Sequence, residues 1–301
     1  MYLIAILAAI LSFVSPFWGL FLIVGFGTRY NVPKQNRVFW IVNLSVMIVI
    51  FITGKNQIST LNFLDALIGS SLLSFIFIWA LNSSKNFTKA IFLAFLIGLI
   101  YSVVRYYLYS SEITKTVQTA YDLYQKYLDK NFPDKQKLMI LKDFMWKTRN
   151  ILVSYQIAIW NISEMFFFYL GMFLFIRYRK NNRDESDLFF NEIHQGETVS
   201  ANKYLRMPYI SVYLLIVFLL MSIISPTKHL GYNLTLSLAT LFAIQGFSIL
   251  DFFWGKFFRK SKILLFLLII SLIFNTFVLI LITLMGLLDI WIDFRKLREE
   301  N

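Results

Sequence analysis

Most of the chain between Leu3 and Leu288 consists of apolar runs that are long enough to cross a bilayer. A spanning helix needs roughly 20 mostly apolar residues, because each residue adds about 1.5 Å against a hydrocarbon core of about 30 Å. The runs cover residues 3–27, 38–53, 61–81, 87–108, 151–176, 207–225, 232–254 and 263–288. Since a segment in lipid must satisfy its own backbone hydrogen bonds, they predict an all-α, polytopic transmembrane helical bundle with about eight spans.

The first run contains Pro16, which lacks a backbone donor and predicts a kink or break near Ser15. The predicted span count therefore ranges from seven to nine. Ala5 and Ala9 lie on one face of this run, at the spacing that lets membrane helices approach closely. They either form a helix-packing face or share this spacing by chance.

Composition agrees with a membrane location. The chain is 58% hydrophobic with a mean hydropathy of +0.64, and 15% of its residues are charged, against about 25% in soluble proteins. The formal net charge of +12 does not indicate nucleic acid, because the basic residues cluster at the ends of apolar runs, where they set membrane orientation.

No motif indicates an enzyme, a metal or a cofactor. The chain has no Cys, and neither His194 nor His229 has a second ligand at metal-binding spacing. The sequence shows no nucleophile with a base, no paired catalytic carboxylates and no phosphate-binding glycine loop. We therefore expect a protein that is not an enzyme and holds no metal or cofactor.

Two longer connections divide the chain. The expected parts are 1–108 with four spans, 109–150 as an amphipathic helical excursion, 151–176 as the fifth span, 177–206 as a polar cytoplasmic loop, and 207–301 with three spans. The excursion is either a pair of ordinary connecting helices or a cap over the bundle mouth. Basic loops place 177–206 in the cytoplasm and the excursion outside.

Glu164 lies near the middle of the fifth span, where an ionised carboxylate is costly and should face the bundle interior or a wet cavity. Helical spacing puts Trp160, Asn161 and Glu164 on one face. This patch suits a cation, a proton or a ligand amine. The alternative is structural: a protonated Glu164 that hydrogen-bonds to a neighbouring helix.

Arg105, near the end of the fourth span, is the candidate counter-ion for Glu164 and completes the expected ligand-binding set. Its position near the span end favours another outcome, in which the guanidinium snorkels to the headgroups. Asp65 is expected to be interfacial, since it lies close to the end of the third span.

The C-terminal segment carries two recognisable strings. One reads Gly-Leu-Leu-Asp-Ile-Trp-Ile-Asp-Phe-Arg-Lys from Gly286, and the other begins at Gln245 and Gly246. Together they resemble the C-terminal half of the YybS-like family, bacterial multi-pass membrane proteins with a domain of unknown function (number 2232). The resemblance implies a cytoplasmic (inner) membrane location and supplies no reaction.

The expected helix-packing or family-motif residues are Ala5, Ala9, Gln245, Gly246, Gly286, Asp289, Asp293 and Arg295. Asp289 and Asp293 would share a helix face, with Arg295 in the headgroup layer. Asp293 and Arg295 are too close in sequence to pair on a helix, so their partners must come from elsewhere.

The leading functional hypothesis is a membrane bundle that binds or translocates a small solute, in the manner of a transporter substrate-binding subunit and without its own ATPase. The likeness to such subunits is an analogy of hydropathy. The alternative is a non-transporting scaffold or assembly factor that recruits a membrane or cytoplasmic protein through its cytoplasmic loops and its C-terminal motif. In both cases the lipid bilayer is the expected partner and nucleic acid is not.

Overall fold

The computed structural model describes residues 2–27, 33–54, 58–84, 86–132, 135–181, 205–261 and 275–295. Every regular element in these ranges is helical, which confirms the all-α prediction. In chain order they are α1 (Tyr2–Val14), α2 (Pro16–Leu22), the π-helical turn η1 (Ile23–Gly27), α3 (Pro33–Thr53), α4 (Thr60–Ala66), the π-helical turn η2 (Leu67–Leu72), α5 (Leu73–Ser84), α6 (Phe87–Asn131), α7 (Lys135–Ser154), α8 (Gln156–Asn181), α10 (Ile210–Ile223), the 3₁₀ turn η5 (Ser225–Thr227), α11 (Lys228–Lys260) and α13 (Thr276–Ile292).

The first apolar run is broken, as Pro16 predicts. Ser15 is extended between α1 and α2, with φ −159° and ψ 120°, and Pro16 opens α2 at a position where no backbone donor is needed. The two short helices pack closely: a Cβ placed on Gly19 would lie 1.9 Å from the hydroxyl of Ser12. The run therefore forms a helical pair rather than one straight span.

Among the described residues, three helices are long and apolar enough to cross a membrane by themselves: Thr60–Leu81, Thr88–Asn131 and Ser225–Trp254. The pair Gln136–Ser154 and Gln156–Met172 adds a fourth if it counts as one bent span. Eight spans are therefore not confirmed.

Shorter apolar helices account for the difference between the eight predicted spans and the three or four candidates found here. They are Tyr2–Val14, Pro16–Phe26, Arg37–Thr53, Ile210–Ile223 and Thr276–Ile292. The predicted run at 207–225, for example, yields the 14-residue α10, which is only about 21 Å long at ~1.5 Å per residue. The helix is shorter than the apolar run because it begins only at Ile210 and ends at Ile223, before the 3₁₀ turn η5.

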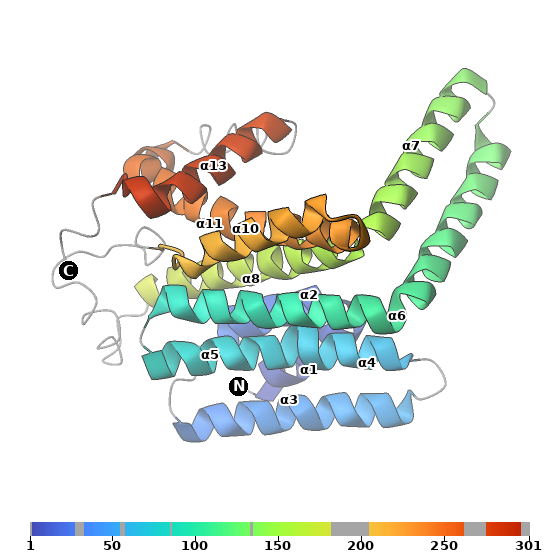
Figure 1. The fold of residues 1–301 in the computed structure, drawn as a ribbon. Coiled ribbons are helices and arrows are strands. Elements are labelled where there is room, and N and C mark those ends of the chain that lie inside the picture. The colour runs from blue at the N-terminus through green and yellow to red at the C-terminus, as the bar shows by residue number, and fades with distance from the viewer. Residues whose placement is uncertain are drawn as a thin grey trace.

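The predicted excursion at 109–150 is part of a helical hairpin. α6 is one 45-residue helix that runs through residue 108 without a break. It ends at Asn131 because Phe132, which precedes Pro133, is extended. α7 then returns toward the bundle, and Figure 1 shows α7 and the C-terminal part of α6 projecting from it. α7 does not continue straight into α8, because the chain bends by 86° at the break between Ser154 and Gln156.

The predicted cytoplasmic loop at 177–206 lies mostly outside the described residues. α8 continues as a helix to Asn181, and the structure describes the chain again from Leu205. The basic connection after α11 also lies partly outside them, since residues 262–274 are not described.

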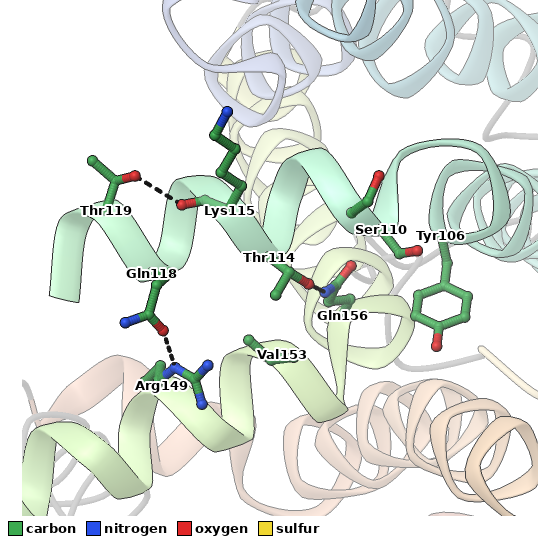
Figure 2. A pocket seen from close by; sticks show the side chains of 10 residues that line it. Tyr106, Ser110, Thr114, Lys115, Gln118, Thr119, Arg149, Val153 and Gln156 are labelled. Carbon is green, nitrogen blue, oxygen red and sulfur yellow. Dashed lines mark hydrogen bonds between the residues drawn. The ribbon is translucent and has the colours of Figure 1, made fainter. Parts of the chain in front are cut away.

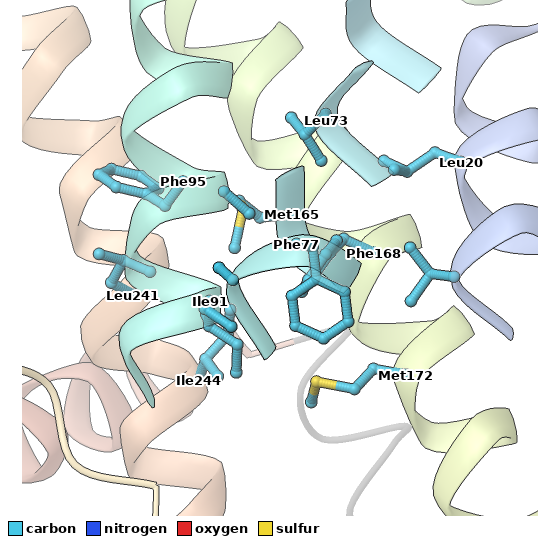
Figure 3. Packing of buried hydrophobic residues seen from close by; sticks show 14 of the residues in the cluster. Leu20, Leu73, Phe77, Ile91, Phe95, Met165, Phe168, Met172, Leu241 and Ile244 are labelled. Carbon is cyan, nitrogen blue, oxygen red and sulfur yellow. The ribbon is translucent and has the colours of Figure 1, made fainter. Parts of the chain in front are cut away.

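The core joins helices that are distant in sequence. Figure 3 shows Phe77 of α5, Phe95 of α6, Phe168 of α8 and Leu241 of α11 packed together, and each is at most 1% exposed. Outside, large apolar side chains are exposed, such as Ile223 at 76%. Monomeric soluble proteins rarely expose contiguous apolar surface, so this exterior fits a lipid environment.

Ala5 and Ala9 lie on a packed face of α1, and both are fully buried. The carbonyl of Ala5 accepts a hydrogen bond from the Asn43 side chain of α3 at 3.0 Å. Ala9 packs with Met47 of α3 and Ala66 of α4. The face thus lets α3 and α4 approach the α1 backbone.

Candidate functional site

Glu164 of α8 is fully buried and lies opposite two glycines. A Cβ on Gly69, in the π-helical turn η2, would lie 3.1 Å from Glu164 Oε1. A Cβ on Gly98 of α6 would lie 2.7 Å from Glu164 Oε2. The carboxyl group fits between η2 and α6 because both facing positions lack a side chain.

One oxygen of this carboxyl group is held and the other is not. Trp160, one turn earlier on α8, donates its indole N–H to Glu164 Oε1 at 2.8 Å. Glu164 Oε2 is buried and has no hydrogen-bond partner among the described residues. Buried polar groups are normally satisfied, so this oxygen needs an explanation.

Asn161 lies beside Glu164, and its side chain also lacks hydrogen-bond partners within the described part of the chain. Its side chain is fully buried, and neither Oδ1 nor Nδ2 has a hydrogen-bond partner within the ranges that the structure describes. Its Nδ2 lies 3.3 Å from the position that a Cβ on Gly98 would take, which is the same position that approaches Glu164 Oε2. One turn of α8 therefore presents an unsatisfied donor and two unsatisfied acceptors next to Gly98.

Arg105 does not pair with Glu164. Its guanidinium makes a two-point ion pair with Asp65, with Nε 2.8 Å from Oδ1 and Nη2 3.0 Å from Oδ2. Asp65, 6% exposed, also accepts a hydrogen bond from the hydroxyl of Tyr101 at 2.5 Å. The expected snorkelling of Arg105 is wrong, because a buried carboxylate across the helix interface holds the guanidinium inside the bundle.

Trp160 connects the Glu164 carboxyl group to the ion pair between Asp65 and Arg105. The guanidinium carbon of Arg105 lies 3.8 Å from the centroid of the Trp160 ring, a close cation–π contact. The ring of Phe17 contacts the indole with a centroid separation of 4.8 Å. Trp160 is therefore held by Arg105 and Phe17 while its N–H orients Glu164.

The charges of the site do not balance when Glu164 is ionised. Asp65 and Arg105 neutralise each other, while an uncharged indole donor is the described partner of Glu164. A buried carboxylate without a cation is strongly disfavoured. An ionised Glu164 therefore lacks a positive charge at Oε2, which a proton, a cation or an ammonium group would supply.

The π-helical turn η2 supplies the wall opposite Glu164. Its Ser71 donates to Asn43 at 2.8 Å, and its Ser70 shares a hydrogen bond with Ser12 at 2.7 Å. These bonds anchor η2 to α1 and α3. Isolated π turns within α-helices are frequent at functional sites.

The residues of the C-terminal strings form a second buried polar cluster. Arg295 Nη2 lies 2.6 Å from Asp289 Oδ2, and the same oxygen accepts a hydrogen bond from Gln245 at 2.9 Å. Arg295 also donates to Ser248 at 2.7 Å and to the carbonyl of Leu205 at 2.8 Å. The cluster ties α11, α13 and the chain before α10 together.

Two glycines bring the α11 and α13 backbones into contact. A Cβ on Gly246 would lie 2.0 Å from the carbonyl oxygen of Ile282, and one on Gly286 would lie 1.9 Å from that of Phe242. No side chain fits at either position. This is close packing of the kind that small residues permit in membrane bundles.

The expected placement of Arg295 and Asp293 is wrong. The Arg295 side chain has no exposed surface, because it pairs with the buried Asp289 carboxylate inside the protein. α13 ends at Ile292, and Asp293 adopts a left-handed conformation (φ 53°), so it does not continue the Asp289 face. Asp293 instead lies 3.4 Å from Arg206, which also donates to the Ile290 carbonyl at 3.1 Å.

Within the described ranges, no three His, Asp or Glu side chains are grouped so that they could hold a metal ion. The ring of His229 lies against Tyr106, with centroids 6.1 Å apart, and His194 falls outside the described residues.

Sequence reasoning found Glu164, Asn161 and Trp160 but missed Asp65 and Tyr101 as partners of Arg105. Asp65 lies 40 residues before Arg105, so their contact depends on how α4 and α6 pack. Gly69 and Gly98 were also missed. An isolated glycine within an apolar run was the available signal.

Comparisons with known proteins find a match for the C-terminal part of the chain. No curated protein and no solved structure matches the chain. Residues 188–290 match a family described as predicted membrane protein (DUF2232), and this range contains α10, α11 and most of α13. Glu164 and Asp65 precede it. The resemblance expected from the tail strings is thereby confirmed: residues 188–290 carry the match to the DUF2232 family of predicted membrane proteins.

Proposed function

We propose that this protein is a multi-pass helical bundle of the bacterial cytoplasmic membrane that binds a small cationic solute at Glu164. The solute would be a cation, a proton or an amine, and the protein would act like the substrate-binding subunit of a transporter rather than as an enzyme. The observation that carries the proposal is the unsatisfied Glu164 Oε2, buried beside an unsatisfied Asn161 side chain.

A cation suits these groups better than an anion. Glu164 Oε2 and Asn161 Oδ1 are both acceptors, and Arg105, the positive side chain that contacts Trp160, is already neutralised by Asp65. An ammonium ion or metal ion would supply the charge that an ionised Glu164 lacks. Intramembrane carboxylates commonly mark ion or proton pathways for this reason.

The surroundings make the site rigid. Arg105 stacks on Trp160, and Trp160 holds Glu164 Oε1. The ion pair therefore orients the carboxyl group without neutralising it. Fixing one oxygen leaves Oε2 in a defined place, which lowers the cost of ordering the site on binding.

The competing scaffold hypothesis has less support from the described residues. It uses the C-terminal motif as a contact surface, but Asp289 and Arg295 bond to each other and are fully buried. The loops that it also invokes lie largely outside the described residues.

The experiment is a thermal-stability titration of detergent-purified protein with Na⁺, K⁺, ammonium, small alkylamines and protons. A ligand of the native state raises stability by about 2.7 kcal/mol at a hundredfold excess over its dissociation constant. The Glu164→Gln variant should fold and lose this response. Asp143→Asn is the matched control, since it makes the same charge change on the exposed surface of α7.

A cation response that is equal in wild type and Glu164→Gln contradicts the proposed site. Absence of any response, with both proteins folded, contradicts solute binding and favours the scaffold. Flux of the identified cation into proteoliposomes then separates binding from transport.

A further inference from the structure

A cavity of about 580 Å³ lies at the elbow where the α6–α7 hairpin meets the bundle. Figure 2 shows its lining side chains, which come from α6, the end of α7 and the start of α8. They are Tyr106, Ser110, Ser111, Thr114, Lys115, Gln118, Thr119, Arg149, Val153 and Gln156. Its volume is in the range of small-molecule sites. It shares no residue with the Glu164 site.

The lining is basic and rich in hydrogen-bond donors. It contains Lys115 and Arg149 and no carboxylate. Arg149 donates through Nε to Gln118 at 2.7 Å and through Nη1 to Asn150 at 2.8 Å, so two neutral amides hold it. Neither cation has a carboxylate partner within the described ranges, which leaves the positive charge of the cavity uncompensated.

The guanidinium of Arg149 is held in place by its neighbours. The bonds to Gln118 and Asn150 fix the plane of the guanidinium, and Nη2 makes no hydrogen bond to the described residues. An arginine fixed in this way presents planar donors that match a phosphate oxygen. Lys115 lies at the rim, and Figure 2 shows its side chain extended away from Arg149.

Gln156 supplies a buried acceptor. Its side chain is 7% exposed, and Nε2 donates to Thr114 at 3.2 Å. Its Oε1 is buried without a partner among the described residues. A matching ligand must therefore carry negative charge and also donate a hydrogen bond, as a phosphate ester with a neighbouring hydroxyl does.

We propose that this elbow cavity binds a phosphate ester bearing a hydroxyl group, with Arg149 on the phosphate, the exposed Lys115 side chain turning in from the rim to join it, and Gln156 Oε1 on the hydroxyl. The bound ligand would bridge α6 to the α7–α8 junction and stabilise the 86° bend. The same chemistry occurs in soluble glycerol phosphate and in the headgroup of phosphatidylglycerol.

Two arms of one experiment distinguish these sources. In the first, the detergent-purified full chain is titrated with glycerol 3-phosphate and its melting temperature is measured. Sulfate, an anion without a hydrogen-bond donor, is titrated in parallel. In the second, native mass spectrometry counts lipid adducts after reconstitution with phosphatidylglycerol or phosphatidylcholine.

Lys115→Gln is the main variant, because the Lys115 ammonium has no partner within the described part of the chain and its loss should not affect folding. Lys126→Gln is its matched control on an exposed part of the same helix, outside the cavity. Loss of one basic contact should weaken binding about fivefold, equivalent to about 1 kcal/mol. Arg149→Gln should weaken it further.

Binding of glycerol 3-phosphate but not sulfate, weakened by Lys115→Gln and unchanged by Lys126→Gln, supports a soluble ligand. Phosphatidylglycerol adducts with the same variant pattern, without a soluble response, support a lipid headgroup. Equal loss in both lysine variants means non-specific attraction and overturns the proposal. Absence of binding in both arms overturns it as well. Neither result bears on the cation response of Glu164.

Discussion

The guanidinium of Arg295 lies 2.6 Å from the carboxylate of Asp289, and neither side chain has exposed surface. The contact is possible because α13 ends at Ile292 and Asp293 turns the chain in a left-handed conformation. The chain can then place Arg295 against the end of its own helix. Gln245 of α11 donates a second hydrogen bond to the same Asp289 oxygen, Oδ2.

Arg295→Met should destabilise the protein by about 3–5 kcal/mol, because it leaves the Asp289 carboxylate buried without a cation. The double variant Asp289→Leu/Arg295→Met should recover most of this loss, since no buried charge remains. Denaturation in detergent measures both. Lys147→Gln, which breaks an exposed ion pair with Asp143, is the control and should cost less than about 1 kcal/mol. Equal stability of Arg295→Met and this control would show that the buried pair has no structural role.

Gly286→Ala should separate α11 from α13. The added methyl group would lie 1.9 Å from the carbonyl oxygen of Phe242, and a backbone atom cannot move aside as a side chain can. We expect a loss of about 1–3 kcal/mol, the usual cost of overpacking. Leu284→Ala on the exposed side of α13 (46% exposed) is the comparison and should change stability much less. If the two variants melt at the same temperature, the backbone contact is not tight.

Tyr101→Phe and Arg105→Gln test the ion pair beside Trp160. Tyr101→Phe removes one hydrogen bond to Asp65 but keeps the two-point contact with Arg105, so we expect a cost of about 1 kcal/mol. Arg105→Gln leaves Asp65 buried without a charge partner and should cost about 3–5 kcal/mol. Thermal denaturation of the two variants in one detergent ranks them. The reverse order would mean that Tyr101, rather than Arg105, satisfies Asp65.

The sequence predicted the elements better than their partners. Long apolar runs located most helices, and Pro16 located the break at Ser15, because both effects are local. The span count was less certain, since whether an apolar run becomes one long helix depends on turns such as η5. The direction of α8 relative to α7 depends on packing at the bend and has no local signal.

For the candidate site, too, the sequence predicted individual residues better than their contacts with other helices. The cost of a carboxylate in an apolar run singled out Glu164, and helical spacing added Trp160 and Asn161. Arg105 was assigned to the headgroups, because its partner Asp65 lies on another helix. Contacts between helices distant in sequence follow from packing, which one sequence without its fold does not reveal.

Gly98→Ala and Gly69→Ala together test whether the proposed cation occupies the space beside Glu164. At Gly98 the new methyl group would approach the unsatisfied Glu164 Oε2 at 2.7 Å, where the proposed cation would sit. At Gly69 it would approach Oε1 at 3.1 Å and the Trp160 ring at 3.3 Å, both of which are already engaged. The two substitutions are chemically identical and differ in which oxygen they face.

We therefore expect the two variants to affect different measurements. Gly98→Ala should weaken the cation response roughly tenfold or more, equivalent to about 1.4 kcal/mol, with a small change in melting temperature, because the displaced atoms are side-chain ends. Gly69→Ala should lower the melting temperature, since the Trp160 ring lies against Arg105, and should leave the response nearer to wild type. Cation titrations monitored by thermal stability give both quantities. A cation response that Gly98→Ala leaves intact would show that the solute does not occupy the space at Oε2.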